Sequence, residues 1–179
     1  IAEAFRRAYH DRARYLGDSD FVDVPMARLT SKSYAAERAM SISPDHASIS
    51  ADSQNAAPEH ANTTHFSIID RAGNRVAATM SINTAFGSGF VAGGTGVILN
   101  NEMDDFTSAV GVGNVYGLTG GYANAIEPGK RPLSSMAPTF VEDRRGVMVM
   151  GTPGGSRIIS MTALAVLDYS ASREPDMPA

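Results

Sequence analysis

The densest group of chemically active side chains in this sequence lies in residues 100–106, which read N-N-E-M-D-D-F. Three carboxylates and two carboxamides fall within six consecutive positions, directly after an apolar run. Such a segment could be an ordinary solvated loop. It could instead hold an ammonium group, because carboxylates form short, strong hydrogen bonds with charged donors.

Two further segments offer hydrogen-bond donors. Residues 131–136 (R-P-L-S-S-M) carry paired hydroxyl groups, and residues 153–156 (P-G-G-S) expose backbone N–H groups where a helix is expected to begin. The N-terminus of a helix favours an anion. Both segments are therefore candidates for binding a carboxylate or an oxyanion.

Other familiar motifs are present only in part. Residues 87–92 (G-S-G-F-V-A) match a dinucleotide-binding fingerprint, but glycines rather than a helix follow them. Gly129 and Lys130 lack the neighbours that a phosphate-binding loop requires. The four histidines show no metal-ligand spacing, and the chain has no cysteine. We therefore expect no metal and no cofactor, and any nucleophile must be an oxygen or an amine.

Periodicity and turn chemistry predict the elements that position these segments. The pattern predicts helices over residues 2–15, 31–40 and 156–169, and strands over residues 64–70, 74–82, 97–99, 139–141 and 146–150, of which the short apolar one at 97–99 is expected to be buried. Residues 44–62 are polar with a single large apolar side chain, which predicts a mobile linker. The long Gly- and Asn-rich stretch at residues 100–135 predicts a functional loop.

The first two strands form a hairpin whose register can be read from its turn. Residues 71–73 (R-A-G) make a three-residue loop with its glycine in the left-handed conformation, which pairs Asp70 with Asn74. Counting outward from that pair sets Thr63 opposite Ser81. The linker therefore ends at a strand whose first residue faces another hydroxyl.

Length and charge narrow the class of protein. The chain has 179 residues, 43% of them hydrophobic, which suits one compact unit with a sizeable core. Its formal net charge of -4 provides no basic face for nucleic acid. No apolar run approaches the roughly 18 residues that a transmembrane helix needs. We expect neither a nucleic-acid partner nor a membrane segment in this chain.

Five motifs occur in a fixed order along the chain. They are residues 63–67 (T-T-H-F-S), 100–106 (N-N-E-M-D-D-F), 114–118 (N-V-Y-G-L), 130–136 (K-R-P-L-S-S-M) and 153–157 (P-G-G-S-R). Together they resemble the γ-glutamyltranspeptidase family. The resemblance implies an α+β fold, the αββα sandwich of N-terminal-nucleophile hydrolases, incomplete in this chain. It implies that residues 1–62 end a large subunit, and that residues 63–179 are most of a small catalytic subunit.

The resemblance also implies self-cleavage between Asn62 and Thr63, which would make a nucleophile of Thr63. An internal hydroxyl is a weak nucleophile, but a threonine at a new N-terminus carries an α-amine with a reference pKa of about 7.7–8.0. That amine is partly neutral near physiological pH and can accept the hydroxyl proton itself. No separate base is then needed.

Around this nucleophile the resemblance implies the machinery of acyl transfer. Ser81 would hydrogen-bond near the Thr63 hydroxyl, and Gly154 and Gly155 would donate N–H groups to the tetrahedral oxyanion. Ser81 and Asn83 share parity on one predicted strand, so both could face the same pocket.

The resemblance assigns the remaining site residues to the substrate. Asn83, Glu102 and Asp105 would hold the α-amino end of a γ-glutamyl compound. Ser134 and Ser135 would hold its α-carboxylate. Tyr116 would lie on a lid loop over the site.

The implied activity is transfer or hydrolysis of γ-glutamyl groups from glutathione and similar compounds, with water, an amino acid or a peptide as acceptor. The family also uses an arginine from a large-subunit region that this chain lacks, so that region is an expected partner. The motifs give no alignment for the polar, proline-containing tail at residues 170–179. Export to the periplasm or the medium is expected from the resemblance.

Two alternatives stay open. One is a related acylase that processes cephalosporin, glutaryl or poly-γ-glutamate substrates. The acidic pair of Glu102 and Asp105 disfavours it, because a glutaryl side chain has no ammonium group for that pair to hold. The other is a non-catalytic fragment in which the motif residues persist without an assembled site.

Overall fold

The computed structural model describes residues 1–49, 62–109, 111–114 and 117–172. The chain forms two compact units, rather than the single unit expected from its length. Unit 1 comprises Ile1–Pro58 and Met103–Ser134, and unit 2 comprises Glu59–Glu102 and Ser135–Ala179. Each unit is therefore assembled from two separate stretches of sequence.

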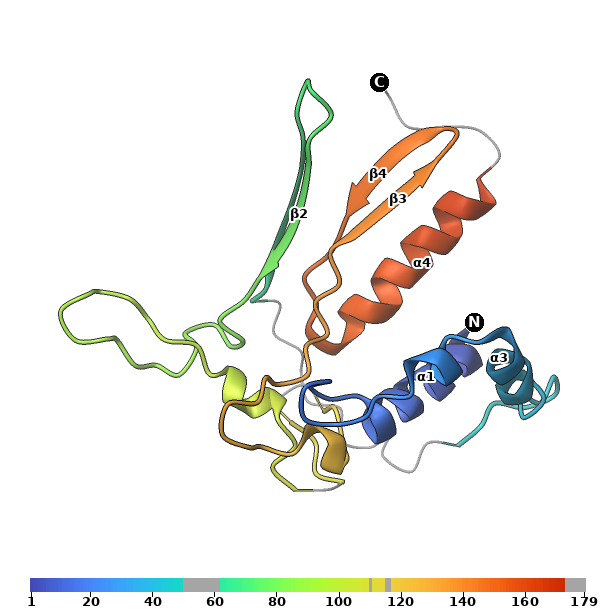
Figure 1. The fold of residues 1–179 in the computed structure, drawn as a ribbon, viewed down its shortest axis with the longest axis horizontal. Helices are drawn as coiled ribbons and strands as arrows, with labels where there is room; N and C mark the ends of the chain where they lie inside the picture. The colour runs from blue at the N-terminus through green and yellow to red at the C-terminus, as the bar shows by residue number, and fades with distance from the viewer. Residues whose placement is uncertain (50–61, 110, 115–116, 173–179) are drawn as a thin grey trace. The chain divides into compact units, whose positions relative to one another are not determined.

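Unit 1 is built on helices (Figure 1). The helices α1 (Ala2–Tyr15) and α3 (Lys32–Ala39) pack against each other and lie close to their predicted bounds. The Ser31 hydroxyl accepts a hydrogen bond of 3.1 Å from the N–H of Tyr34, which caps the start of α3. The short helix α2 (Met26–Leu29) was not predicted, because four residues are too few to show a helical period.

The beginning of the predicted linker is anchored to α1. Ser48 donates to the Glu3 carboxylate through its N–H at 2.9 Å and through its hydroxyl at 2.8 Å. The Arg6 guanidinium donates to the carbonyl groups of Ser48 and Ile49. The rest of the linker, residues 50–61, lies outside the described residues, so its mobility stays a prediction.

The described residues of unit 2 form two β-hairpins and one long helix (Figure 1). The first hairpin pairs β1 (Thr64–Ile69) with β2 (Arg75–Met80), and the second pairs β3 (Thr139–Asp143) with β4 (Gly146–Met150). The two hairpins contact each other through β1, β2 and β4. The helix α4 (Ile158–Ala171) runs beside the second hairpin.

Arg145, in the turn of the second hairpin, fastens α4 to that hairpin. Its guanidinium donates to the carbonyl groups of Tyr169 and Ser172 at 2.8 and 2.9 Å. It also lies 3.9 Å from the centre of the Tyr169 ring. At its other end α4 begins at Ile158, two residues later than predicted, because a 3-10 turn, η3 (Gly155–Arg157), precedes it.

The predicted register of the first hairpin is confirmed. Asp70 donates its N–H to the carbonyl of Asn74 at 3.0 Å, and the turn glycine has a φ of 84°. The ladder pairs Thr64 with Met80, so the next pair outward is Thr63 with Ser81.

The predicted buried strand at residues 97–99 is wrong. Val97, Ile98 and Leu99 are 56%, 39% and 44% exposed. Among the described residues this run forms one isolated bridge, from Ile98 to Val91. The backbone of Val97 and Leu99 does hydrogen-bond residues 88–92 of the same loop, but the pairing is too irregular to make a ladder and the apolar side chains stay exposed.

The predicted functional loop at residues 100–135 has little regular structure. Within its described part it contains two short 3-10 helices, η1 (Glu102–Asp105) and η2 (Tyr122–Asn124). No helix in the described parts of the chain is both long and apolar enough to cross a membrane.

Candidate active site

The hydroxyl groups of Thr63 and Ser81 meet at the open end of the first hairpin. Thr63 Oγ1 donates to Ser81 Oγ at 3.2 Å. Ser81 Oγ also accepts the backbone N–H of Asn83 at 2.9 Å. Thr63 is therefore held by the strand register, and Asn83 is held against the same hydroxyl.

Like Ser81, Asn83 lies beyond the end of β2, so the expectation that the two residues share a strand is wrong. Its φ of 75° is left-handed, and it is only 2% exposed. Its Nδ2 donates to the carbonyl of Asn101 at 3.2 Å. The Oδ1 of Asn101 accepts the N–H of Thr84 at 3.1 Å. Asn101, which sequence reasoning did not single out, thus fixes the turn that carries Asn83.

His65 follows Thr63 by two residues, yet its ring is already fully engaged. Its Nδ1 lies 2.8 Å from Thr79 Oγ1, and its Nε2 lies 2.9 Å from Ser67 Oγ. A neutral imidazole donates through one nitrogen and accepts at the other. Both positions are occupied, which leaves no ring nitrogen to accept the Thr63 proton.

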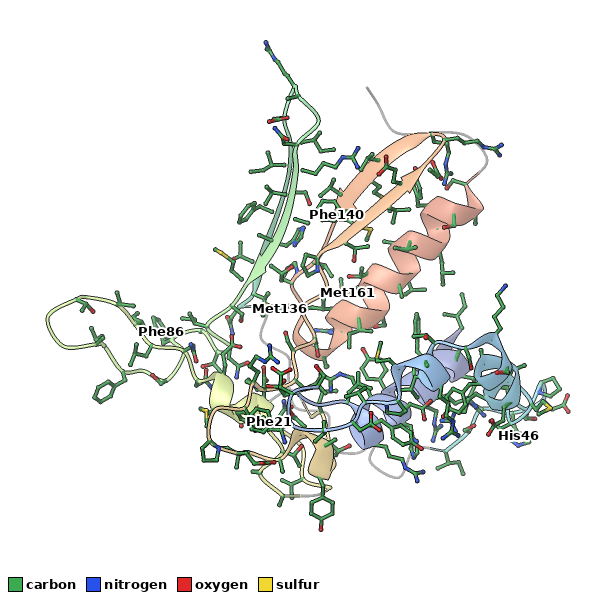
Figure 2. The ribbon with its side chains drawn as sticks, viewed as in Figure 1. Phe21, His46, Phe86, Met136, Phe140 and Met161 are labelled. Atoms are coloured by element: carbon green, nitrogen blue, oxygen red, sulfur yellow. The ribbon has the colours of Figure 1, made fainter. Side chains whose placement is uncertain are left out.

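Gly154 and Gly155 stand at the turn into α4 with unusual backbone angles. Their φ values are 136° and 54°. Within the described part of the chain, the N–H groups of these two residues have no hydrogen-bond partner. A Cβ on Gly154 would lie 3.3 Å from Sδ of Met161, which is labelled on α4 in Figure 2. The turn therefore presents two N–H donors beside a helix start, as an oxyanion site requires.

Glu102 ends the first of the two stretches that make up unit 2, and it begins η1. Its N–H donates to Oδ1 of Asn100 at 3.0 Å, which closes a local turn at the start of this 3-10 helix. Burial raises the pKa of the Glu102 carboxyl. A nearby cation would offset that penalty, because it favours the charged form.

Asp105 belongs to unit 1, where Asn124 holds its backbone. Asn124 is 6% exposed, and its Nδ2 donates to the carbonyl of Asp105 at 2.7 Å. Its Oδ1 accepts the N–H of Leu133 at 3.0 Å. One carboxamide thus joins the acidic segment to the segment that carries Ser134. Sequence reasoning missed Asn124, because it lies in neither of the motifs that it connects.

A cation already lies near the Asp105 carboxylate. Burial lowers the pKa of Arg12 on α1, while attraction to Tyr9 and Asp105 opposes that change. A carboxylate offers about four lone-pair positions. The Asp105 carboxylate can therefore attract the Arg12 guanidinium and also accept hydrogen bonds from a ligand.

A second set of contacts holds the segment just before Ser134. The Asp18 carboxylate, with a side chain 1% exposed, accepts from the N–H and the Nε of Arg131, both at 2.9 Å. These hydrogen bonds hold the pKa of Asp18 well below its usual range. The ammonium of Lys130 lies 3.1 Å from Glu127 Oε1 and 5.8 Å from the ring centre of Phe21, which is labelled in Figure 2.

The predicted site residues fall in both units. Unit 2 holds the predicted catalytic residues, part of the predicted ammonium site and one serine: Thr63, Ser81, Asn83, Glu102, Ser135, Gly154 and Gly155. Unit 1 holds Asp105 and Ser134. Tyr116 lies outside the described residues.

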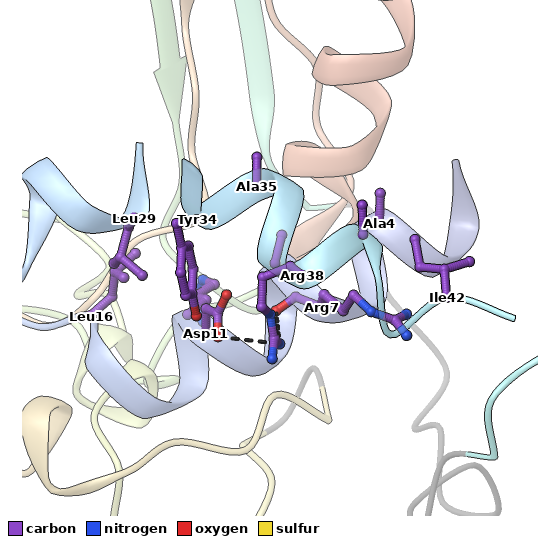
Figure 3. Close-up of a pocket in the computed structure, with 12 residues that line it drawn as sticks. Ala4, Arg7, Asp11, Leu16, Leu29, Tyr34, Ala35, Arg38 and Ile42 are labelled. Atoms are coloured by element: carbon purple, nitrogen blue, oxygen red, sulfur yellow. Dashed lines mark hydrogen bonds and ion pairs between the residues drawn. The ribbon is translucent and has the colours of Figure 1, made fainter. Parts of the chain in front are cut away.

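Unit 1 also contains a cavity of about 320 Å³ between α1 and α3 (Figure 3). Tyr34 lines it, together with Asp11 and Arg38, which form an ion pair of 3.3 Å. None of the predicted site residues lines this cavity. In the described parts of the chain, no group of three or more acidic or histidine side chains is arranged to hold a metal ion.

Comparison with known proteins settles the family. Residues 1–175 match the family model described as gamma-glutamyltranspeptidase, so the match includes part of the tail that the motifs left unaligned. The chain belongs to this family. It is 56% identical over 169 residues to the glutathione hydrolase proenzyme of Pseudomonas sp. (strain A14). It is 51% identical over 172 residues to the glutathione hydrolase proenzyme of Escherichia coli (strain K12). These matches cover 93% and 94% of this chain, which spans 29% and 30% of the two relatives.

A solved structure of the family is similar as well. It is the crystal structure of a Helicobacter pylori γ-glutamyltranspeptidase mutant, 51% identical, with a TM-score of 0.55 and 61% of each chain covered. The predicted family is therefore confirmed, and so is the α+β class of N-terminal-nucleophile hydrolases.

Proposed function

We propose that the protein containing this chain transfers or hydrolyses γ-glutamyl groups through an ester on Thr63, after cleaving itself between Asn62 and Thr63. The observation that carries the proposal is the hydrogen bond from Thr63 Oγ1 to Ser81 Oγ. It fixes a hydroxyl at the residue that would become the new N-terminus.

Self-cleavage begins when Thr63 Oγ attacks the carbonyl carbon of Asn62. The C–N bond then breaks, and the hydroxyl proton passes to the departing nitrogen. Water hydrolyses the resulting ester, which leaves a carboxyl group on Asn62 and a free α-amine on Thr63. An oriented hydroxyl and carbonyl make this step effectively unimolecular.

Turnover reuses the same hydroxyl with the new amine as its base. Thr63 Oγ attacks the γ-carbonyl of the substrate, and the N–H groups of Gly154 and Gly155 stabilise the tetrahedral oxyanion. The leaving amine takes a proton, and water or an acceptor amine then releases the γ-glutamyl group. The full engagement of His65 supports the amine as base.

The substrate's α-amino acid end would be held by opposite charges. Asn83, Glu102 and Asp105 would accept from its ammonium group, Ser134 and Ser135 would donate to its carboxylate, and Tyr116 would cover the site. The two relatives named glutathione hydrolase proenzymes support glutathione as one donor. Export from the cytoplasm is part of the proposal, and cell fractionation tests it.

Substitution of Thr63 in the full-length reading frame tests the nucleophile. Thr63→Ala is expected to abolish both self-cleavage and γ-glutamyl hydrolysis, because both reactions use this hydroxyl. Intact mass reports the cleavage, and release of a chromogenic anilide reports the turnover. Thr64→Ala is the matched control, since Thr64 is exposed and alternates to the other face of the strand. If Thr63→Ala still splits before residue 63, the assignment is wrong.

Asp105→Ala tests the grip on the ammonium. It is expected to leave self-cleavage intact and to lower kcat/KM on a γ-glutamyl anilide by about 30-fold or more. The lost charged partner in a desolvated site costs about 2–5 kcal/mol. Exposed Asp104 provides the control variant Asp104→Ala. Faster release from a glutaryl anilide than from a γ-glutamyl anilide would favour the acylase alternative.

A further inference from the structure

Gly151 is the first residue after β4. It is not among the glycines with a positive φ, so its backbone would accept an alanine. An added Cβ would nevertheless lie 2.3 Å from Cε1, 2.4 Å from Nδ1 and 2.9 Å from Nε2 of His65. The imidazole ring therefore occupies the space that any side chain at position 151 would need.

Hydrogen bonds at both ring nitrogens restrain the orientation of the His65 side chain. Thr79, on the neighbouring strand, anchors Nδ1, and Ser67, two residues along β1, anchors Nε2. A ring fixed at both nitrogens cannot turn aside to admit a Cβ. The contact with Gly151 thus links the first hairpin, which carries His65 on β1, to the end of β4 in the second hairpin.

The two partners of this contact lie next to the residues that would do the chemistry. His65 is two residues from Thr63, and Gly151 is three residues from Gly154. Three residues span at most about 10 Å of chain. Where Gly151 rests on the hairpin therefore limits where the N–H groups of Gly154 and Gly155 can lie relative to Thr63.

We propose that the contact between His65 and Gly151 sets the position of the oxyanion turn against the nucleophile, with His65 acting as a positioning residue. The inference rests on the proposed function, because it needs Thr63 as nucleophile. The ring takes no proton in this account. It acts through its volume and its two hydrogen bonds.

The consequence is a defect confined to the chemical steps. Self-cleavage and turnover each form a tetrahedral oxyanion next to Thr63, so displacing the turn slows both. The contact touches none of the residues proposed to hold the substrate's ammonium or carboxylate. We therefore expect kcat and the self-cleavage rate to fall together while KM stays unchanged.

A double-mutant cycle in the full-length reading frame tests the contact. Gly151→Ala is expected to lower kcat and self-cleavage by about 10- to 100-fold, because a displacement of 1 Å can cost about 10²-fold. In a His65→Ala background the same change is expected to cost less than about twofold, since the obstructing ring is absent. Gly93→Ala is the matched control, because a Cβ there would meet nothing within 4 Å.

Thr79→Val provides a second test that keeps the strand and the side-chain volume. It removes the hydroxyl that anchors Nδ1, and we expect kcat and self-cleavage to fall several-fold with KM unchanged. The inference is overturned if Gly151→Ala is neutral, or if it costs as much without His65 as with it. It is also overturned if Thr79→Val changes KM rather than kcat.

The wild-type protein separates this inference from the proposed function. Wild-type enzyme that releases no γ-glutamyl anilide and does not cleave itself contradicts the proposed function and, with it, the inference. If the wild-type enzyme is active but the effects of Gly151→Ala and His65→Ala on kcat simply add, only the positioning role is contradicted. If Gly151→Ala fails to fold, its rescue by His65→Ala supports the contact, and absence of rescue overturns it.

Discussion

The surroundings of Thr63 and those of Asp105 are built in different ways. At Thr63 the partners meet through strand register, since Ser81 faces the threonine across one antiparallel pair. At Asp105 the partners meet through a single carboxamide, since Asn124 bonds the backbone on both sides of the loop. A register places a hydroxyl through many backbone hydrogen bonds, whereas the loop depends on a few side-chain contacts.

This difference separates two kinds of variant. Changes around Thr63 act on the bond-making steps and should lower kcat and self-cleavage. Changes around Asn124 act on the segments proposed to hold the substrate and should raise KM. A variant near Thr63 that changed only KM, or a variant near Asn124 that changed only kcat, would contradict this separation of roles.

The largest effect in this comparison is expected from Ser81→Ala. Thr63 loses its acceptor, so kcat and self-cleavage should fall about tenfold, in line with the roughly 1–3 kcal/mol cost of an unmade buried hydrogen bond. KM should rise by less, because the N–H of Asn83 loses the same partner. Ser81→Thr keeps a hydroxyl and should retain most activity. Steady-state kinetics and intact mass measure both effects.

A smaller effect, on a different parameter, is expected from Asn124→Ala. Both the Asp105 carbonyl and the Leu133 N–H lose their partner, so KM should rise several-fold with kcat and self-cleavage nearly unchanged. Tyr122→Ala is the control, because Tyr122 lies on the same 3-10 turn and is 82% exposed. Equal loss of self-cleavage in Asn124→Ala would mean that the two regions are not separable.

The smallest effect concerns pH. Burial raises the pKa of Glu102, so its carboxylate is lost at a higher pH than that of an ordinary glutamate. KM for a γ-glutamyl anilide should therefore rise as the pH falls through that raised pKa, and Glu102→Gln should remove this acidic limb. A group with a raised folded pKa stabilises the fold below its unfolded pKa, and this contribution is lost as the pH rises through the folded value. Glu102→Gln should thus melt slightly higher than wild type near neutral pH.

Sequence patterns correctly predicted the features that depend on neighbouring residues, such as turns and helix starts. The turn between Asp70 and Asn74 was enough to place Thr63 opposite Ser81, and Ser31 marked the start of α3. The family motifs supplied the remaining candidates for the site. Each of these features depends on residues that are close in sequence or on an ordered set of motifs.

The supporting contacts could not be predicted in this way. Asn124 bonds residues 19 positions before it and 9 positions after it, and Gly151 meets His65 across two hairpins. Such contacts depend on tertiary packing, which leaves no periodic signal. The wrong prediction of a buried strand at residues 97–99 has the same origin, because a short apolar run does not show whether other elements will cover it.

Trapping the covalent intermediate tests the central claim most directly. Full-length enzyme would be mixed with a γ-glutamyl anilide, quenched in acid and digested, and its peptides analysed by mass spectrometry. We predict a peptide that begins at Thr63 and carries one γ-glutamyl group as an ester on that residue. A γ-glutamyl group on another residue, or a peptide that runs uncleaved through Asn62 and Thr63 in active enzyme, would contradict the account.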